Sequence, residues 1–369
     1  MQFSISREAL LKPLQLVAGV VERRQTLPVL SNVLLVLHEG QLSLTGTDLE
    51  VELVGRVAVD EEDAQSGEIT VPARKLLDIA KSLPDGATIK FSVENQKVTI
   101  KSGRSRFTLS TLPASEFPAV EDGPNTLSFE LQQKQMKRLI DAVSFSMAQQ
   151  DVRYYLNGML LEIGPDAVRS VATDGHRLAL CTLNMPVEGV SSPRQSILPR
   201  KGVMELVRFL ADGDVPVRVM LGANHLRAQT EDFTFTTKLV DGKFPDYERV
   251  LPRGGNNQIN ADRQELRQAF SRAAILSNEK YRGVRLILEA GQLTLVANNP
   301  EQEEAEETVA IDYSGSSFEI GFNVSYLVDV LNALSSEIVR ISLADANSSA
   351  LIESADGSDA LYVVMPMRL

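Results

Sequence analysis

Apolar residues recur at helical spacing in residues 71–83, directly after a strand-like segment. One helical face carries only apolar side chains, which are Leu76, Leu77, Ala80 and Leu83. The opposite face is polar and carries Arg74, Asp78 and Lys81. Pro72 stands where the first turn of a helix tolerates proline, so the pattern predicts an amphipathic helix. Taken alone, this pattern is typical of an ordinary surface helix.

The same stretch occurs twice more along the chain. Residues 198–210 repeat it, with Glu205 and Arg208 where the first copy has Asp78 and Lys81. Residues 321–334 keep the apolar stripe and Asp329 but have lost the basic residues. The copies are roughly 125 residues apart, which is about the size of one domain. The repetition therefore indicates three homologous domains.

Segments that alternate with period two surround each helix and predict antiparallel strands. Residues 40–48 recur as 291–299, with 168–174 as the intermediate copy, and 107–111 are echoed by 233–237. A second helical pattern opens each repeat, at residues 7–21, 132–147 and 262–276. We therefore expect an α+β fold of three repeated domains, each with two helices packed on antiparallel sheets.

Two segments rich in proline and glycine, residues 113–125 and 245–257, are the natural linkers between these repeats. They place the first domain at residues 1–125. The second then covers 126–254 and the third 255–369.

Bulk composition is ordinary for a globular protein, with 43% hydrophobic and 23% charged residues in a chain of 369. Cys181 is the only cysteine, so no intrachain disulfide can form, which suits a reducing cytoplasm. No run approaches the roughly 18 apolar residues of a membrane helix, and the first residues do not form a signal peptide. We therefore expect a cytoplasmic protein without a membrane partner.

Complete catalytic motifs are absent from the sequence. It has no phosphate-binding loop, no dinucleotide-binding glycine motif and no paired-histidine or paired-cysteine metal motif. Its three histidines leave few candidates for metal or triad chemistry. Residues 173–177 read Thr-Asp-Gly-His-Arg and resemble an active-site signature. The equivalent turn of the first repeat lacks the His-Arg pair, so a turn or a binding surface is the favoured interpretation, without cofactor or metal.

Charge is distributed unevenly. The six helical windows, counted over residues 6–24, 72–83, 132–147, 199–210, 262–276 and 323–334, together carry +8, whereas the whole chain carries −12. The strands and loops are therefore acidic and the helices basic, which is typical of a layer of helices that faces a polyanion. The alternative is that helices simply contain more lysine and arginine.

Geometry restricts how basic helices could surround a duplex. Helices about 10 Å wide leave almost no bore when six form a circle, whereas twelve leave a bore of roughly 30 Å. A closed ring of helices around duplex DNA therefore needs two chains, which makes this chain half of a two-fold assembly.

The two ends of the chain are complementary enough to close such a ring. The first repeat carries basic residues next to apolar ones, namely Arg104, Arg106, Phe107 and Leu109. The third repeat carries an acidic run with two apolar neighbours, namely Glu301, Glu303, Glu304, Glu306 and Glu307 with Ile275 and Leu276. We expect head-to-tail pairing of these surfaces, although a glutamate run can also be a solvated face.

Four longer stretches resemble the bacterial β sliding clamp family, the processivity subunit of DNA polymerase III, and the likeness extends over essentially the whole chain. They are residues 150–159, 171–178, 238–247 and 362–369. The resemblance implies a head-to-tail homodimeric ring that encircles duplex DNA, slides without sequence specificity and carries out no catalysis. It also implies partners that bind a shared peptide groove: the polymerase III catalytic subunit, the clamp loader, and other polymerases and repair proteins.

The resemblance also implies two sets of site residues. The peptide groove would be formed by Leu156, Thr173, Gly175, His176, Arg177, Leu178, Pro245, Arg249, Val250, Val363, Val364, Met365, Pro366, Met367 and Arg368. The DNA contacts would be Arg24, Gln150, Tyr154, Tyr155, Lys201, Tyr281, Asn323 and Tyr326. An apolar tail with two methionines suits a groove, although it also suits a closing edge strand, and both can hold together.

Two other functions remain possible from the sequence. The chain could be a monomeric adaptor whose domains carry peptide grooves and touch no DNA. It could also be an enzyme, which the lack of a complete catalytic constellation makes the weakest interpretation.

Overall fold

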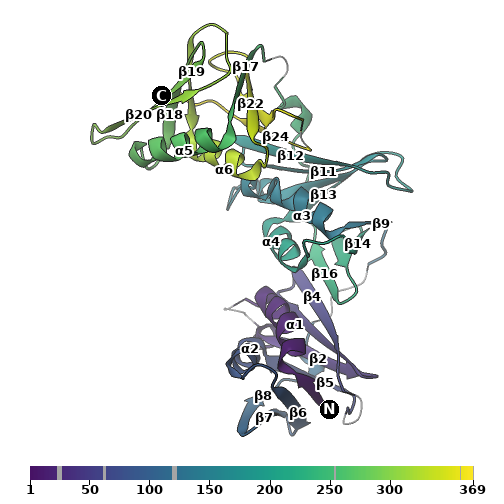
Figure 1. The fold of residues 1–369 in the computed structure, drawn as a ribbon. Helices are drawn as coiled ribbons and strands as arrows, with labels where there is room; N and C mark the ends of the chain where they lie inside the picture. Colours follow the sequence, from purple (N-terminus) through teal and green to yellow (C-terminus); the bar gives the residue numbers. More distant parts are fainter. Residues whose placement is uncertain (23–26, 61–63, 119–122, 253–254, 358, 369) are drawn as a thin grey trace. The chain divides into compact units, whose positions relative to one another are not determined.

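The computed structural model describes residues 1–22, 27–60, 64–118, 123–252, 255–357 and 359–368. The chain divides into two compact units (Figure 1). The first consists of Met1–Met136 and Lys201–Leu239, and the second of Lys137–Arg200 and Val240–Leu369. The division therefore does not follow the three sequence repeats, because each unit takes part of the middle one.

The first unit contains one eight-stranded and one four-stranded antiparallel sheet. The larger sheet has the order β5-β2-β3-β4-β16-β15-β14-β9. Its strands are β2 (Asn32–His38), β3 (Gln41–Thr47), β4 (Val51–Ala58), β5 (Gly67–Pro72), β9 (Leu127–Gln132), β14 (Pro216–Leu221), β15 (His225–Gln229) and β16 (Phe233–Lys238). The smaller sheet, in the order β1-β6-β7-β8, consists of β1 (Gln2–Ser6), β6 (Thr88–Glu94), β7 (Lys97–Ser102) and β8 (Ser105–Ser110).

The second unit repeats this plan. Its larger sheet has the order β13-β10-β11-β12-β24-β23-β22-β17. These strands are β10 (Gly158–Ile163), β11 (Ala167–Thr173), β12 (Arg177–Asn184), β13 (Arg194–Pro199), β17 (Asn257–Asp262), β22 (Ile338–Leu343), β23 (Ala350–Ser354) and β24 (Ala360–Val364). The smaller sheet, β20-β19-β18-β21, consists of β18 (Gly283–Glu289), β19 (Gln292–Asn298), β20 (Glu304–Ala310) and β21 (Phe318–Asn323).

Six α-helices lie in the described part of the chain, two for each sequence repeat. They are α1 (Arg7–Val20), α2 (Ala73–Ser82), α3 (Gln133–Asp141), α4 (Arg200–Phe209), α5 (Arg263–Ala273) and α6 (Val324–Ala333). The expected fold class of helices packed on antiparallel sheets is confirmed. One prediction was too long: the helix expected over residues 132–147 ends at Asp141 and continues as a 3-10 turn, Ser144–Ser146. Val143 and two serines favour helix interiors weakly, which explains the early end.

Three of the described helices, α1, α5 and α6, begin at a residue whose side chain caps them. Ser6 accepts a hydrogen bond from the backbone N–H of Ala9, and Asp262 accepts one from Glu265. Asn323 caps α6 in the same way, through Ser325 and Tyr326. Each of these side chains satisfies N–H groups that have no partner within the helix. None of the described helices is long and apolar enough to cross a membrane.

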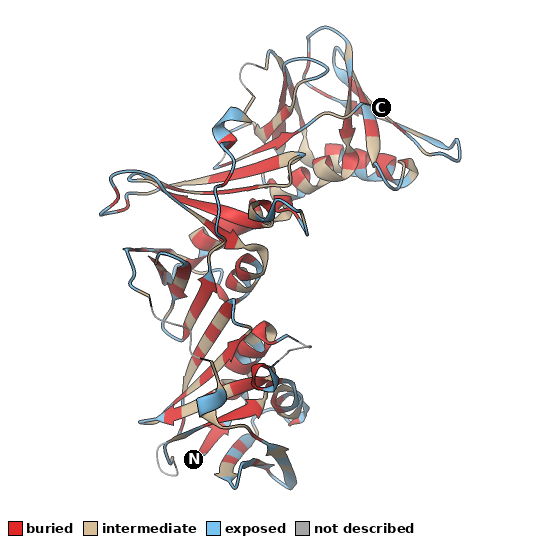
Figure 2. Ribbon diagram, turned by 180° about the vertical axis from the view of Figure 1, so that it is seen from behind, coloured by how far each residue is buried: buried red, intermediate tan, exposed pale blue. Residues whose placement is uncertain are grey.

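The two large sheets share strand order and register but differ in burial. Asn32 pairs with Pro72 across β2 and β5 as Gly158 pairs with Pro199 across β10 and β13. Strand β2 alternates between buried and half-buried residues, whereas every residue of β10 is buried. In Figure 2 the strands around β10 and β11 are red along most of their length, while β2, β3 and β4 are banded. Strand β10 is therefore covered on both faces, whereas β2 is fully covered on only one.

Candidate functional site

A tight turn between β11 and β12 contains the Thr-Asp-Gly-His-Arg signature. Thr173 donates its hydroxyl to the carbonyl of Arg177 at 2.6 Å and accepts the N–H of Gly175 at 3.1 Å. Asp174 accepts the N–H groups of His176 and Arg177 through one carboxylate oxygen, at 2.9 and 3.0 Å. Gly175 has φ of +88°, a conformation that glycine adopts without strain. These polar groups stabilise the turn itself and form no nucleophile–base pair.

The Arg177 guanidinium joins this turn to α6. It donates to the second oxygen of Asp174 at 3.1 Å, to Asp329 of α6 at 2.5 Å and to the carbonyl of Phe145 at 2.8 Å. It also lies 4.5 Å from the ring centre of Tyr326. Only 11% of the Arg177 side chain is exposed. Its charge is therefore used within the protein, and its hydrogen bonds connect the second and third sequence repeats.

The C-terminal tail lies beside the same turn. Met365 donates its N–H to the carbonyl of His176 at 2.9 Å, and Met367 donates to Gly321 of β21 at 2.8 Å. The exposed His176 ring stacks on Tyr326 at 6.4 Å between centres. The side chain of Met365 is 39% exposed. Backbone hydrogen bonds thus fix the tail while a flexible apolar side chain remains at the surface.

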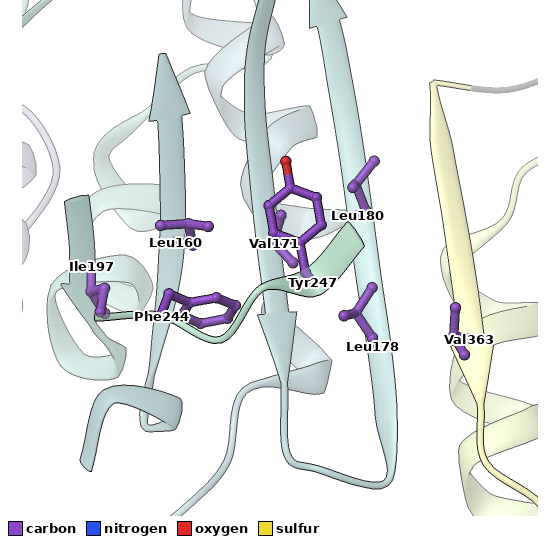
Figure 3. Packing of buried hydrophobic residues seen from close by; sticks show 8 residues of the cluster. All are labelled: Leu160, Val171, Leu178, Leu180, Ile197, Phe244, Tyr247 and Val363. Carbon is purple, nitrogen blue, oxygen red and sulfur yellow. The ribbon is translucent and has the colours of Figure 1, made fainter. Parts of the chain in front are cut away.

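A cluster of buried apolar side chains lies on the sheet face next to this tail (Figure 3). It consists of Leu160, Val171, Leu178, Leu180, Ile197, Phe244, Tyr247 and Val363. The segment with Phe244 and Tyr247 crosses the face of the strands in Figure 3. Tyr155, Val250 and Leu361 pack against the cluster and are only partly buried. The segment expected to be a linker therefore forms an apolar wall on the sheet.

Glu162 binds the wall to the sheet. This carboxylate accepts the Tyr247 hydroxyl at 2.9 Å, the Gln195 amide at 2.7 Å and the Arg169 guanidinium at 3.0 Å. Burial raises the pKa of Glu162, but the three hydrogen bonds outweigh it and the net pKa is lowered. Burial and the Glu162 carboxylate raise the pKa of the Tyr247 hydroxyl, which stays protonated and donates. Glu162 is therefore ionised near neutral pH and fully hydrogen-bonded.

The residues expected to form the groove all lie in the second unit. Leu178 and Val363 belong to the apolar cluster, and Val250 packs against it. Thr173, Gly175, His176 and Arg177 form the turn described above. Leu156 is buried, whereas Pro245 and Arg249 are exposed, and Arg249 pairs with Asp246 at 2.8 Å. Val364 is buried beside Val363, so its side chain points to the opposite sheet face. Pro366 and Met367 are half-buried and Arg368 is exposed.

Among the residues expected to contact DNA, Lys201 is already paired in the first unit. Its ammonium forms ion pairs with Glu22 and Asp48. Burial lowers the pKa of Lys201, but hydrogen bonds to the two carboxylates outweigh it and the net pKa is raised. Arg24 lies outside the described residues. In the first unit, therefore, the described candidate has its charge compensated by carboxylates.

The remaining DNA candidates lie in the second unit. Tyr154 and Tyr281 are more than half exposed, at 56% and 57%. Gln150 is exposed with φ of +56°, and Tyr155 packs against the apolar cluster. Tyr326 is half-buried against Arg177. Asn323 uses its carbonyl oxygen to cap α6, which leaves its amide N–H groups to donate.

The expected dimer surfaces coincide with two edge strands. β8 ends the four-stranded sheet of the first unit and β20 ends that of the second, so each presents one unpaired backbone edge. Arg104 and Arg106 are exposed, and Phe107 and Leu109 are half-buried. An edge strand with exposed polar groups can pair with a strand of another chain.

The edge of the second unit at β20 carries both the acidic and the apolar side chains that the sequence predicted for the dimer surface. Glu301, Glu303, Glu304 and Glu306 are exposed, while Glu307 is half-buried and accepts two hydrogen bonds from Arg272, both 2.8 Å long. Ile275 is 74% exposed and Leu276 is half-buried. The apolar and charged groups of β8 thus have counterparts beside β20.

Sequence reasoning missed the floor and the wall of the apolar surface. Its expected groove set did not include Leu160, Val171, Leu180, Ile197, Phe244, Tyr247 or Glu162. A signal was present, because residues 158–163 read Gly-Met-Leu-Leu-Glu-Ile without alternation, which is typical of a strand buried on both faces. Phe244 lies within the stretch 238–247 that resembles the family, directly before the segment interpreted as a linker.

No metal-binding chemistry is found in the part of the chain that the structure describes, where no group of three or more His, Cys, Asp or Glu side chains could hold an ion. Cys181 is buried, and burial raises its pKa to about 12. Its thiol is therefore protonated and unreactive at neutral pH.

Three family models match consecutive parts of the chain. They describe the N-terminal, central and C-terminal domains of the DNA polymerase III beta subunit, and match residues 1–121, 130–246 and 248–368.

Individual relatives match along the full length. A beta sliding clamp from Pseudomonas putida is 66% identical, and one from Escherichia coli K12 is 57% identical, with complete coverage of both chains in each case. A crystal structure of a sliding clamp, the DNA polymerase III subunit beta of Pseudomonas aeruginosa bound to griselimycin, superposes with a TM-score of 0.97 at 65% identity and complete coverage.

Proposed function

Since the chain belongs to the DNA polymerase III beta subunit family, we propose that it is a sliding clamp: two copies close a ring around duplex DNA. The ring slides without sequence specificity and tethers the replicative polymerase and other proteins of replication and repair. The observation that carries this function is 66% identity to a beta sliding clamp over the complete length of both chains. The family is non-catalytic, and we assign the chain no reaction and place it in the cytoplasm.

The peptide-binding groove is the surface formed by the apolar cluster, the 173–177 turn and the C-terminal tail. Partner proteins would insert apolar side chains against Leu178, Val250 and Val363, with Met365 adapting to each. The partly buried apolar residues beside the cluster support this role, since such surfaces mark interaction sites. The partners include the polymerase III catalytic subunit and the clamp loader.

The homodimer would close by pairing β8 of one copy with β20 of the other. The two unpaired strand edges support backbone hydrogen bonding between copies. Phe107 and Leu109 would pack against Ile275 and Leu276, and the basic and acidic side chains would complement each other. The three domains would span residues 1–125, 126–254 and 255–369.

DNA contacts of such a ring need only position the duplex. The eight candidates are Arg24, Gln150, Tyr154, Tyr155, Lys201, Tyr281, Asn323 and Tyr326. Tyrosine, asparagine and glutamine donate to phosphates without reading bases, so we expect weak, salt-sensitive binding.

Retention on circular DNA tests the ring. The full-length protein is loaded onto nicked circular duplex by a clamp loader and isolated by gel filtration, before and after linearisation. A clamp remains on the circle and leaves the linear product. Equal retention on both forms would remove the topological mechanism and favour a protein that simply binds DNA.

Two variants test the surfaces separately. Ile275→Ala with Leu276→Ala should yield monomers in sedimentation equilibrium, and a dimer of unchanged stability would place the seam elsewhere. Deletion of residues 365–369 should abolish binding of a clamp-binding peptide while the dimer persists. Unchanged peptide affinity after this deletion would refute the groove.

A further inference from the structure

A cleft of about 740 Å³ lies in the first unit between α1, α2 and α4. Four basic side chains line it: Lys12, Arg74, Lys81 and Arg208. No carboxylate occurs among the described residues that line it. The cleft shares no residue with the peptide groove, the dimer seam or the eight DNA candidates.

The floor of this cleft is apolar. Leu16 of α1 and Leu77 of α2 are half-buried there, and Phe209 closes it from α4. The volume falls within the roughly 300–1,000 Å³ of small-ligand pockets, so the cleft can admit one unit of a chain but not the body of a duplex.

Arg208 lies over a gap in α1 that Gly19 provides. A β-carbon at Gly19 would stand 2.9 Å from the guanidinium of Arg208, which is too close for contact. Arg208 also pairs with Glu205 of its own helix at 2.9 Å, and this pair holds the guanidinium at the cleft. Packing over Gly19 and the ion pair with Glu205 therefore both position the Arg208 guanidinium.

The other three cations differ from Lys201 in how their charge is compensated. Lys201 has two carboxylate partners. Lys12, Arg74 and Lys81 are exposed at the rim, and no described carboxylate forms an ion pair with them. Three cations without a described carboxylate partner therefore surround the cleft, which attracts a polyanion.

We propose that this cleft binds a single-stranded segment of nucleic acid, with phosphates on the four cations and a base against Leu16 and Leu77. A duplex offers phosphates but keeps its bases stacked, so the apolar floor would remain without a partner. A single strand can occupy both the cations and the apolar floor. Its bases are free to pack on apolar side chains, while its phosphates bind the basic side chains. The choice of nucleic acid over other polyanions rests on the proposed clamp function.

A fluorescein-labelled oligothymidylate tests the site by anisotropy with the full-length protein over a range of salt. The variant Arg74→Gln/Lys81→Gln should weaken binding about tenfold at low salt and reduce the slope of log K against log salt by about 1.4, or about 0.7 for each lost contact. The matched control Lys75→Gln/Lys90→Gln removes the same charge from exposed positions outside the cleft and should bind like wild type. Equal loss in both variants would overturn the proposal.

A second variant tests the floor. Leu77→Ser should weaken binding of the oligothymidylate several-fold but leave binding of a duplex of equal length unchanged. If both ligands weaken equally, or if thymidine triphosphate displaces the oligonucleotide at equal concentration of phosphate, the assignment to a single strand is wrong. Retention on circular DNA is measured on the same variants, so failure here stays separate from failure of the clamp function.

Discussion

The two eight-stranded sheets have the same strand order and register, yet only one offers an apolar outer face. In the second unit Leu178 of β12 pairs with Val363 of β24, whereas in the first unit Glu52 of β4 pairs with Thr236 of β16. Val171 and Ile197 correspond likewise to Thr45 and Thr70. One backbone plan thus carries apolar side chains at these positions in the second unit and polar side chains at the equivalent positions in the first.

The turns that join these strands also correspond. Thr47 donates to the carbonyl of Val51 at 2.8 Å, as Thr173 does to Arg177, and Asp48 accepts two N–H groups as Asp174 does. The free oxygen of each aspartate differs in its partner, which is Lys201 for Asp48 and Arg177 for Asp174. The turn is therefore a shared structural element, and the second unit differs in carrying His176 and Arg177 where the first carries Glu50 and Val51.

The largest effect is expected when the second unit receives the acidic residue that the first unit has at the equivalent position. Leu178→Glu places a carboxylate where the exposed fraction is 2%, among Phe244, Tyr247 and Val363. An unpaired buried charge costs about 4 kcal/mol or more. We expect a lower unfolding temperature in calorimetry and no measurable peptide binding.

The reciprocal change is the control. Glu52→Leu alters the equivalent position of the first unit, where no groove is proposed, and should leave peptide affinity unchanged. If Leu178→Glu binds peptide like wild type, the apolar face is not the groove.

The free energy of unfolding should depend more on Arg177 in the second unit than on Lys201 in the first. Arg177→Met removes charged hydrogen bonds to Asp174 and Asp329 from a side chain that is 11% exposed, so we expect a loss of about 3 kcal/mol in unfolding free energy. Lys201→Met removes ion pairs from a side chain that is 30% exposed, where about 1 kcal/mol is expected. Chemical denaturation measures both. Equal losses of unfolding free energy in the two variants would show that the burial of the side chain does not determine how much it stabilises the protein.

Much of this architecture was visible in the sequence, because repetition and periodicity are local properties. The repeated helix at residues 71–83, 198–210 and 321–334 predicted three similar domains, and all three helices are present. The charged runs singled out in the sequence lie partly on edge strands, since Arg106 lies on β8 and Glu304, Glu306 and Glu307 lie on β20.

The groove could not be derived in the same way. The apolar cluster combines residues from five strands with Phe244, directly before a presumed linker, and Tyr247 within it, and only tertiary packing brings them together. The partners of Lys201 were also invisible, because Glu22, Asp48 and Lys201 are far apart in sequence. Sequence chemistry suggested a free cation, whereas tertiary contacts compensate its charge.

The two units should also differ in how their stability depends on pH. Glu162 has its pKa lowered in the folded state, so its stabilising contribution is present above its ordinary pKa of 4.5 and is lost as pH falls through the lowered value. The equivalent position in the first unit is Val36, which cannot titrate. Tyr247→Phe removes one hydrogen bond to the carboxylate, which should cost about 1.5 kcal/mol at neutral pH.

The same change should raise the folded pKa of Glu162 towards 4.5, so less stability remains to be lost on acidification. Unfolding temperatures of wild type and Tyr247→Phe, measured between about pH 6 and pH 3, should therefore converge as the carboxylate is protonated. A difference that stays constant over this range would show that the hydroxyl acts by packing alone.

The smallest expected effect lies in the turns themselves. Leu49 has φ of +79° where its counterpart Gly175 has +88°. A left-handed conformation costs a non-glycine residue about 1–2 kcal/mol, whereas glycine loses about 0.5–1 kcal/mol more on folding. Leu49→Gly should therefore raise the unfolding free energy by at most about 0.5 kcal/mol. Gly175→Ala should lower it by about 1 kcal/mol, because its β-carbon would also meet the Arg153 guanidinium at 3.0 Å. If the two variants change the unfolding free energy in opposite directions in chemical denaturation, the turns share one backbone conformation and only Leu49 is strained in it. A change in the same direction would contradict this.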